Sequence, residues 1–192
     1  MKDRTHSAWQ QPIDDWVETY TGKKFRFMNP SPEDIDIVDI AHALSMTCRF
    51  GGHCKKFYSV AEHSIHVSVL VAGSAKIALS GLLHDAAEAY LSDICAPVKG
   101  FLPRYKEIES SLLGAILAKF GLPRKVSAEI KLVDRRMCIT EGLQLLNNAN
   151  DWGWDIAPYN FDLKLWSNRA AEKMFLDRFE TLQLLLGLTG AP

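Results

Sequence analysis

Two adjacent residues, His84 and Asp85, are the side chains best suited to chemistry, because they stand together in the apolar segment GLLHDAAE. We expect this segment to belong to one helix running from about Ala75 to Leu91. A buried aspartate is strongly unfavourable unless it is paired or bound to a metal. Both side chains can converge on one ion over the helix, and Glu88 overhangs the same face. The pair therefore predicts a metal site.

Further ligands for such a site are expected from other helices. His63 ends the segment YSVAEH on the preceding helix, and Asp134 lies in KLVDRR on a long later helix. Two imidazoles and two carboxylates suit a divalent ion such as Zn, Mn, Co or Fe, and the lack of thiolates argues against a closed structural zinc site. Such an ion lowers the pKa of bound water to about 7, which supplies a nucleophile at neutral pH.

The order of these residues on successive helices resembles the HD-domain superfamily of metal-dependent phosphohydrolases. Three segments, VAEHS (60–64), HDAAEAYLSDICAPVK (84–99) and KLVDRR (131–136), are similar to its bacterial and phage deoxynucleotide phosphohydrolases. These include 5′-deoxynucleotidases and phage dATP triphosphohydrolases, and residues 39–53 look most like the phage members. The resemblance covers about residues 33–145 and implies an all-α fold, a single HD-domain helical bundle.

The resemblance implies a role for each matching residue. Glu88 matches the family acid that lies beside the nucleophilic water and the phosphorus. Asp93 matches a second carboxylate, which is suited to delivering a proton to the leaving ester oxygen. The residues that match the metal ligands are His63, His84, Asp85 and Asp134.

Three further positions match substrate-binding residues of the family. Arg49 and Lys99 match a phosphate-binding arginine and lysine. Phe50 stands where relatives often carry a tryptophan that packs on the sugar or base; phenylalanine retains stacking but lacks the indole donor. Phosphoryl transfer needs a positioned nucleophile, cations around the phosphate oxygens and an acid for the leaving group, so the assignments agree with the chemistry.

Two reactions on deoxynucleotides fit this site. A triphosphohydrolase releases nucleoside and tripolyphosphate, whereas a 5′-nucleotidase releases nucleoside and phosphate. An additional Mg ion can enter with the substrate phosphates. Guanosine tetraphosphate hydrolases of the superfamily typically follow the HD pair with Glu-Asp, but Ala89 follows Glu88 here. We favour the triphosphohydrolase, with dATP as substrate, because further cations suit a longer anionic tail: Lys55, Lys56, Arg104 and Lys106.

A non-catalytic, metal-stabilised helical binding module is the remoter alternative. Binding alone needs neither Glu88 nor Asp93, so the presence of both favours an enzyme. Among the other histidines, His66 is expected to be a hydrogen-bonded helper or a surface residue, while the roles of His42 and His53 stay open. Packing or subunit contacts are expected of the five tryptophans: Trp9, Trp16, Trp152, Trp154 and Trp166.

The elements that must position these residues are six or seven helices with essentially no sheet. Ser59-Val60-Ala61-Glu62 has a capping-box pattern, in which the Ser and Glu side chains each satisfy a free backbone donor at a helix start. A short extended piece is expected at 23–27. The helices are expected near residues 13–20, 33–50, 59–72, 75–91, 103–120, 125–147 and 166–186.

The composition is that of one globular domain spanning 1–192, with the C-terminal helix packed on the motif core. Of the 192 residues, 47% are hydrophobic and 23% charged, and the formal net charge of -1 argues against a stable nucleic-acid partner. No export signal or apolar run of membrane length is visible, so we expect a cytoplasmic protein (host cytoplasm if phage-encoded) with reduced cysteines and no membrane partner. The resemblance implies a homo-oligomer, and the Trp-rich loop (148–163) and the last helix are candidates for its interface.

Overall fold

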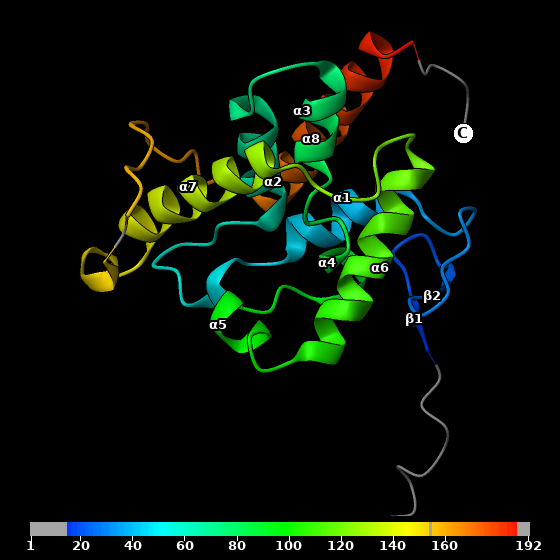
Figure 1. The fold of residues 1–192 in the computed structure, drawn as a ribbon, viewed down its shortest axis with the longest axis horizontal. Helices are drawn as coiled ribbons and strands as arrows, with labels where there is room; N and C mark the ends of the chain where they lie inside the picture. The colour runs from blue at the N-terminus through cyan, green and yellow to red at the C-terminus, as the bar shows by residue number, and fades with distance from the viewer. Residues whose placement is uncertain (1–14, 154, 188–192) are drawn as a thin grey trace, which may run out of the picture.

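Helices form most of the described part of the chain, residues 15–153 and 155–187 of this computed structural model (Figure 1). These residues contain eight α-helices and one two-stranded sheet, which confirms the all-α expectation in its broad form. Among them, no helix has the length and apolarity needed to cross a bilayer. The helices are α1 (Ile37–Met46), α2 (Val60–Leu70), α3 (Ala75–Leu82), α4 (Glu88–Leu91), α5 (Ala96–Lys99), α6 (Pro103–Lys119), α7 (Ala128–Leu145) and α8 (Asn168–Leu185), with 3-10 turns η2 (Phe50–Gly52) and η3 (Ala149–Trp152).

A β-hairpin precedes the helices. Its strands β1 (Trp16–Glu18) and β2 (Lys24–Arg26) pair antiparallel across a turn in which Gly22 takes a φ of 81°. The short extended piece expected here is confirmed, whereas the helix predicted near 13–20 is wrong; its first two residues lie outside the described chain. Phe25 on β2 is fully buried and stacks on an aromatic ring of α4, so tertiary packing outweighs the local helical pattern.

Side-chain caps mark the starts of five of the described helices. The helix expected from Glu33 starts only at Ile37, because the Asp36 carboxylate accepts a hydrogen bond from Val38 N at 2.9 Å. Helices α2, α3, α7 and α8 also begin after a capping side chain, whereas α6 begins at Pro103 without one. The predicted starts of these helices shift by a few residues at most. The caps that accept a bond from the first turn are Asp36, Ser59, Ser74, Ser127 and Ser167.

The predicted capping box at the start of α2 is confirmed only in part. Ser59 Oγ accepts a hydrogen bond from Glu62 N at 3.1 Å, as expected. The Glu62 carboxylate does not turn back to the helix start; it accepts hydrogen bonds from Leu165 N at 2.8 Å and Trp166 N at 2.7 Å. Glu62 is fully buried, so this acid fastens the segment before α8 to α2.

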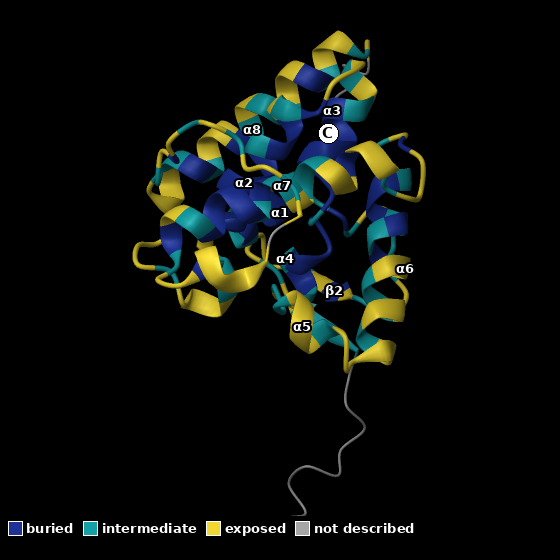
Figure 2. Cartoon of the chain, turned by 60° about the vertical axis from the view of Figure 1, so that its left-hand side comes forward, coloured by how far each residue is buried: buried dark blue, intermediate teal, exposed yellow. Residues whose placement is uncertain are grey.

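Helix α2 lies at the centre of the fold, where it contacts α1, α3, α7 and α8. Figure 2 shows the buried residues gathered where these helices meet, and α8 packs across α1, α2 and α3 through buried residues such as Phe175. His63, the fourth residue of α2, is fully buried. A polar side chain in that position needs partners inside the protein, because it has no access to bulk water.

The helix expected at 75–91 is interrupted at the His-Asp pair, so the prediction of one continuous helix is wrong. Residues 83–87 form tight turns between α3 and α4, with backbone N–H groups bonded to carbonyls three residues back. The Gly81 carbonyl, which a continuous helix would bond to a backbone N–H, lies 2.8 Å from His84 Nδ1 instead. His84 and Asp85 therefore project from a turn, not from a regular helix.

Candidate metal centre

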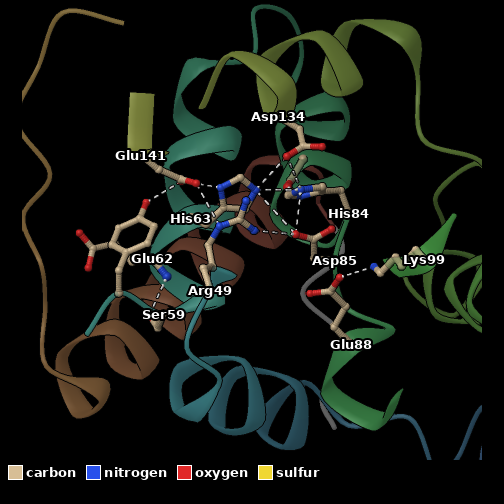
Figure 3. A network of polar contacts seen from close by, with 12 residues as sticks. Arg49, Ser59, Glu62, His63, His84, Asp85, Glu88, Lys99, Asp134 and Glu141 are labelled. Carbon is tan, nitrogen blue, oxygen red and sulfur yellow. Dashed lines mark hydrogen bonds and ion pairs between the residues drawn. The ribbon is translucent and has the colours of Figure 1, made fainter. Parts of the chain in front are cut away.

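Four predicted ligands come together where three parts of the fold meet (Figure 3). His63 comes from α2, His84 and Asp85 from the turn between α3 and α4, and Asp134 from α7. His63 Nε2 lies 3.2 Å from His84 Nε2 and 3.1 Å from Asp134 Oδ1. His84 Nε2 lies 3.7 Å from Asp134 Oδ1. Asp85 Oδ2 lies 3.2 Å from His84 Nε2 and 3.6 Å from His63 Nε2.

These separations match the spacing of donor atoms around one metal ion. With metal–ligand distances of about 2.0–2.2 Å, neighbouring donors in a coordination sphere stand about 3–3.5 Å apart. The ligand atoms of His63, His84 and Asp134 all lie within 4.8 Å of one another, and this group can bind a metal ion. Asp85 contacts both histidines from the side opposite Asp134 (Figure 3).

Hydrogen bonds direct the Nε2 atoms of both imidazoles toward the centre. His63 Nδ1 lies 2.6 Å from Glu141 Oε1, and His84 Nδ1 lies 2.8 Å from the Gly81 carbonyl oxygen. A carboxylate and a carbonyl only accept hydrogen bonds, so we assign a proton to each Nδ1. In the neutral rings the Nε2 lone pairs then face each other, which favours a cation between them.

Carboxylates control the electrostatics of this cluster. Burial lowers the pKa of His63 and of His84, but the neighbouring carboxylates outweigh it and hold both values above the ordinary range. Burial raises the pKa of Asp134, yet the two histidines keep it well below its usual range. The carboxylates are therefore ionised and attract a cation, which can enter beside Asp134 because its side chain is 38% exposed.

Glu141 is a site residue that the sequence analysis missed. Its buried carboxylate accepts hydrogen bonds from His63 Nδ1 at 2.6 Å, Tyr58 Oη at 2.8 Å and Arg49 Nε at 3.0 Å. Burial raises the pKa of Glu141, but Arg49 and His63 bring it below the ordinary value. The available signal is spacing: Glu141 follows Asp134 by seven residues, about two helical turns, and so shares its face of α7.

The two predicted substrate-binding residues of the η2 region lie next to the cluster. Besides its bond to Glu141, Arg49 places Nη1 3.6 Å from Asp85 Oδ2, and its side chain is only 11% exposed. The same guanidinium lies over the Phe50 ring, 5.6 Å from the ring centroid. Arg49 thus contacts the cluster directly, and Phe50 lies against Arg49.

Glu88 and Lys99 form an ion pair beside the cluster (Figure 3). Lys99 Nζ donates to Glu88 Oε1 at 2.8 Å and to Glu109 Oε1 at 2.6 Å. Glu88 is buried, and its Oε2 has no hydrogen-bond partner within the described ranges. Burial, followed by Asp85 and Asp93, raises the pKa of Glu88 well above its usual range despite Lys99. A carboxyl group of raised pKa suits proton transfer.

Asp93 lies half-buried on the loop after α4. Burial raises its pKa against the opposing charges of Arg49 and Lys99, so it belongs to the same charged cluster. The preceding residue, Ser92, has a φ of 70°, which is uncommon for a residue other than glycine. The Ser92 carbonyl accepts a hydrogen bond from Tyr105 Oη at 2.7 Å, through which α6 holds this loop.

Two of the three described histidines without an assigned role, His42 and His66, pack against other side chains. His42 Nδ1 lies 3.2 Å from Glu172 Oε2, and the His42 ring stacks on Tyr20. His66 stacks on Trp166, and its Nε2 has no hydrogen-bond partner among the described residues, so it is a packed residue and not the hydrogen-bonded helper or surface residue that was expected. His53 is exposed.

The tryptophans that the structure describes pack at separate places. Trp166 lies against α2 through His66, Trp16 carries a lysine ammonium over its ring, and Trp152 is 52% exposed. Trp9 and Trp154 lie outside the described residues. All four cysteines are free thiols. None of these groups belongs to the metal-binding cluster as it is described.

Comparison with known proteins identifies relatives of the chain, but their names state no activity. No family model matches it. It is 42% identical over 174 residues to the uncharacterized protein YfdR of Escherichia coli, an alignment that covers 88% of this chain and 97% of that protein. An uncharacterized protein of Rhodobacter capsulatus is 38% identical over 124 residues, covering 60% and 63% of the two chains. The chain therefore belongs to the same family as YfdR.

Proposed function

We propose that the protein is a metal-dependent phosphohydrolase of the HD-domain type, which hydrolyses deoxynucleotides in the cytoplasm. The observation that carries the proposal is the set of contacts of 3.1–3.7 Å that joins His63, His84, Asp85 and Asp134 around one point. A purely structural cluster would not need two facing imidazole nitrogens flanked by two carboxylates. A guanidinium, that of Arg49, lies directly beside them.

The roles of the surrounding residues follow from their positions and charge. A divalent ion (Zn, Mn, Co or Fe) held by the four side chains would supply Lewis acidity and lower the pKa of water to about 7. Arg49 and Lys99 would bind phosphate oxygens, and Phe50 would stack on the sugar or base. Glu88 and Asp93, whose pKa values are raised, would hold and deliver protons at the attacking water and the leaving 5′ oxygen.

We favour a deoxynucleoside triphosphate such as dATP as the substrate, with an additional Mg ion bound to its phosphates. Lys55, Lys56 and Lys106 are exposed cations suited to a triphosphate tail. One observation favours the alternative, a 5′-deoxynucleotidase acting on monophosphates. Arg104, the fourth cation invoked for the tail, is already paired with Glu107 at 2.9 Å.

Product analysis tests the proposal. The protein, stripped of metal with a chelator and reloaded with Mn, Co, Zn or Fe, is incubated with deoxynucleoside mono- and triphosphates, with and without Mg. Release of tripolyphosphate from dATP supports the favoured reaction, whereas phosphate released only from monophosphates supports the nucleotidase. Bound metal without turnover of any nucleotide would instead indicate a binding module.

A matched pair of histidine variants links the activity to the cluster. His84→Ala removes a ligand and should abolish turnover. His42→Ala removes a histidine that is also paired with a carboxylate, but on α1, and should keep turnover near that of the natural protein. Equal activity of the two variants would contradict the proposed site. Light scattering of the same samples tests the expected homo-oligomer.

A further inference from the structure

The two carboxylate oxygens of Glu141 contact different parts of the site. Oε1 accepts hydrogen bonds from His63 Nδ1 at 2.6 Å and from Tyr58 Oη at 2.8 Å. Oε2 accepts a hydrogen bond from Arg49 Nε at 3.0 Å. One oxygen therefore faces a histidine of the metal cluster, and the other faces the arginine that lies beside it (Figure 3).

These contacts require a carboxylate and not merely a polar side chain. Each of the three partners directs an N–H or O–H group at Glu141, which is fully buried and out of reach of solvent. An amide in its place would turn its NH2 group toward either His63 Nδ1 or Arg49 Nε, so that two donors would face each other. Only an acceptor at both ends satisfies His63 and Arg49 together.

The same contacts orient the reactive ends of both partners. Because His63 Nδ1 is committed to Glu141, its Nε2 points at His84, Asp85 and Asp134. Arg49 uses Nε for Glu141, which leaves its terminal Nη1 directed at the cluster, 3.6 Å from Asp85 Oδ2. Outer carboxylates of this kind fix the orientation of ligating histidines.

We propose that Glu141 is a positioning residue that aligns His63 with the metal ion and Arg49 with the anionic group of the substrate through one rigid carboxylate. The part that concerns His63 needs only the metal cluster, whereas the part that concerns Arg49 rests on the proposed function. A single change at Glu141 should therefore impair two measurable properties, metal affinity and substrate KM. A residue with a merely structural role would impair neither in the folded protein.

The first measurement is cobalt binding, which is independent of turnover. Titration of metal-free protein with Co²⁺, followed by visible absorption, gives the affinity and a spectrum that reports ligand geometry. We expect Glu141→Gln to weaken cobalt binding by about 10- to 100-fold and to alter the spectrum. The matched control is Glu62→Gln, which also changes a fully buried glutamate but one that bonds the backbone of Leu165 and Trp166. Its cobalt affinity and spectrum should stay those of the natural protein.

The second measurement is a double-mutant cycle, which tests whether Glu141 positions Arg49. With metal saturating, Glu141→Gln should raise KM more than it lowers kcat. In an Arg49→Ala background the same substitution should leave KM unchanged, because its target is gone, while it still weakens cobalt binding. If Glu141→Gln does not fold, Glu141→Asp serves in its place, since it keeps both acceptor oxygens but is one methylene too short to reach both partners.

The outcomes distinguish this inference from the proposed function. Unchanged cobalt affinity and KM in a folded Glu141 variant, or equal losses in Glu62→Gln, would overturn the inference even if the natural protein hydrolyses nucleotides. Weakened cobalt binding in a protein that hydrolyses no nucleotide would support the positioning of His63 and contradict the proposed function.

Discussion

Asp134 Oδ1 lies 3.1 Å from His63 Nε2, and this contact joins α7 to the buried helix α2. A metal ion held between these side chains would fasten the two helices to the turn that carries His84 and Asp85. Such an ion stabilises the native state by mass action, since the unfolded chain does not hold the four side chains together.

The first prediction concerns this stabilisation. Urea unfolding of the natural protein with Mn²⁺ at 100 times its dissociation constant should show about 2.7 kcal/mol more stability than without metal. Asp134→Asn should remove most of this increment. Asp155→Asn, which alters an exposed aspartate paired with Arg135, should keep it. Metal-dependent stabilisation that persists in Asp134→Asn would show that the ion binds elsewhere.

The second prediction concerns pH. The pKa values of His63 and His84 are raised above the ordinary 6.5, so protons compete with a metal ion near neutral pH. The apparent metal affinity should therefore fall as the pH is lowered through the raised values. Asp134 contributes nothing in this window, because its pKa is held well below its usual range. Calorimetry in buffers of different ionisation enthalpy should detect proton release on binding; an affinity independent of pH would contradict the prediction.

The stability of the metal-free protein, in contrast to its metal affinity, should fall as the pH rises. A group whose pKa is raised by folding contributes stability below its unfolded pKa and loses that contribution as the pH rises through the folded value. His63 and His84 are such groups, so unfolding without metal should become easier above neutral pH. Loading with metal should abolish this loss. Urea midpoints at several pH values, with and without metal, measure it.

The third prediction concerns the pair of Glu88 and Lys99. Lys99→Met leaves the buried Glu88 carboxylate without its cation and should lower the free energy of unfolding by about 3 kcal/mol. Adding Glu88→Gln to this variant should recover most of the loss. Glu109→Gln removes only the more exposed partner of Lys99 and should cost less than about 1 kcal/mol. Equal losses in the Lys99 and Glu109 variants would argue against the Glu88 contact.

The fourth prediction concerns the loop that carries Asp93. Tyr105→Phe removes the hydrogen bond to the Ser92 carbonyl but keeps the packed ring. We expect kcat to fall by about tenfold through displacement of Asp93. The free energy of unfolding should change by less than about 1.5 kcal/mol. An unchanged kcat would show that α6 does not position this loop.

The helices and the site differ in how far the sequence could predict them. Capping residues such as Ser127 and Ser167 mark helix starts locally, so the long helices are predicted to within a few residues. The break after α3 is not visible in this way, because LLHDAAE is a good helical sequence and the contact of His84 Nδ1 with the Gly81 carbonyl interrupts it. The expected six or seven helices consequently differ from the eight within residues 15–153 and 155–187, which also include the short α5.

The sequence could predict the candidate metal ligands but not the residue that hydrogen-bonds to them, Glu141. His84 and Asp85 stand out because polar groups in an apolar segment need a reason, and the resemblance of VAEHS and KLVDRR to family motifs adds His63 and Asp134. The structure brings all four together. Glu141 follows in the polar-looking sequence of α7, and its partners come from distant segments. Only the packing of α7 on α2 could show that this glutamate is buried.

Because Glu62 accepts hydrogen bonds from the backbone of Leu165 and Trp166, we expect a fragment that lacks this segment to fold poorly. All four metal-binding residues lie before residue 145, which suggests trimming the chain there. A protein cut at that point would keep the whole cluster but leave the Glu62 carboxylate buried without its two donors and α1 to α3 without the cover of α8. The part of the chain that carries the His/Asp cluster therefore depends on α8 for its cover, and shortened versions of the protein should retain everything through α8.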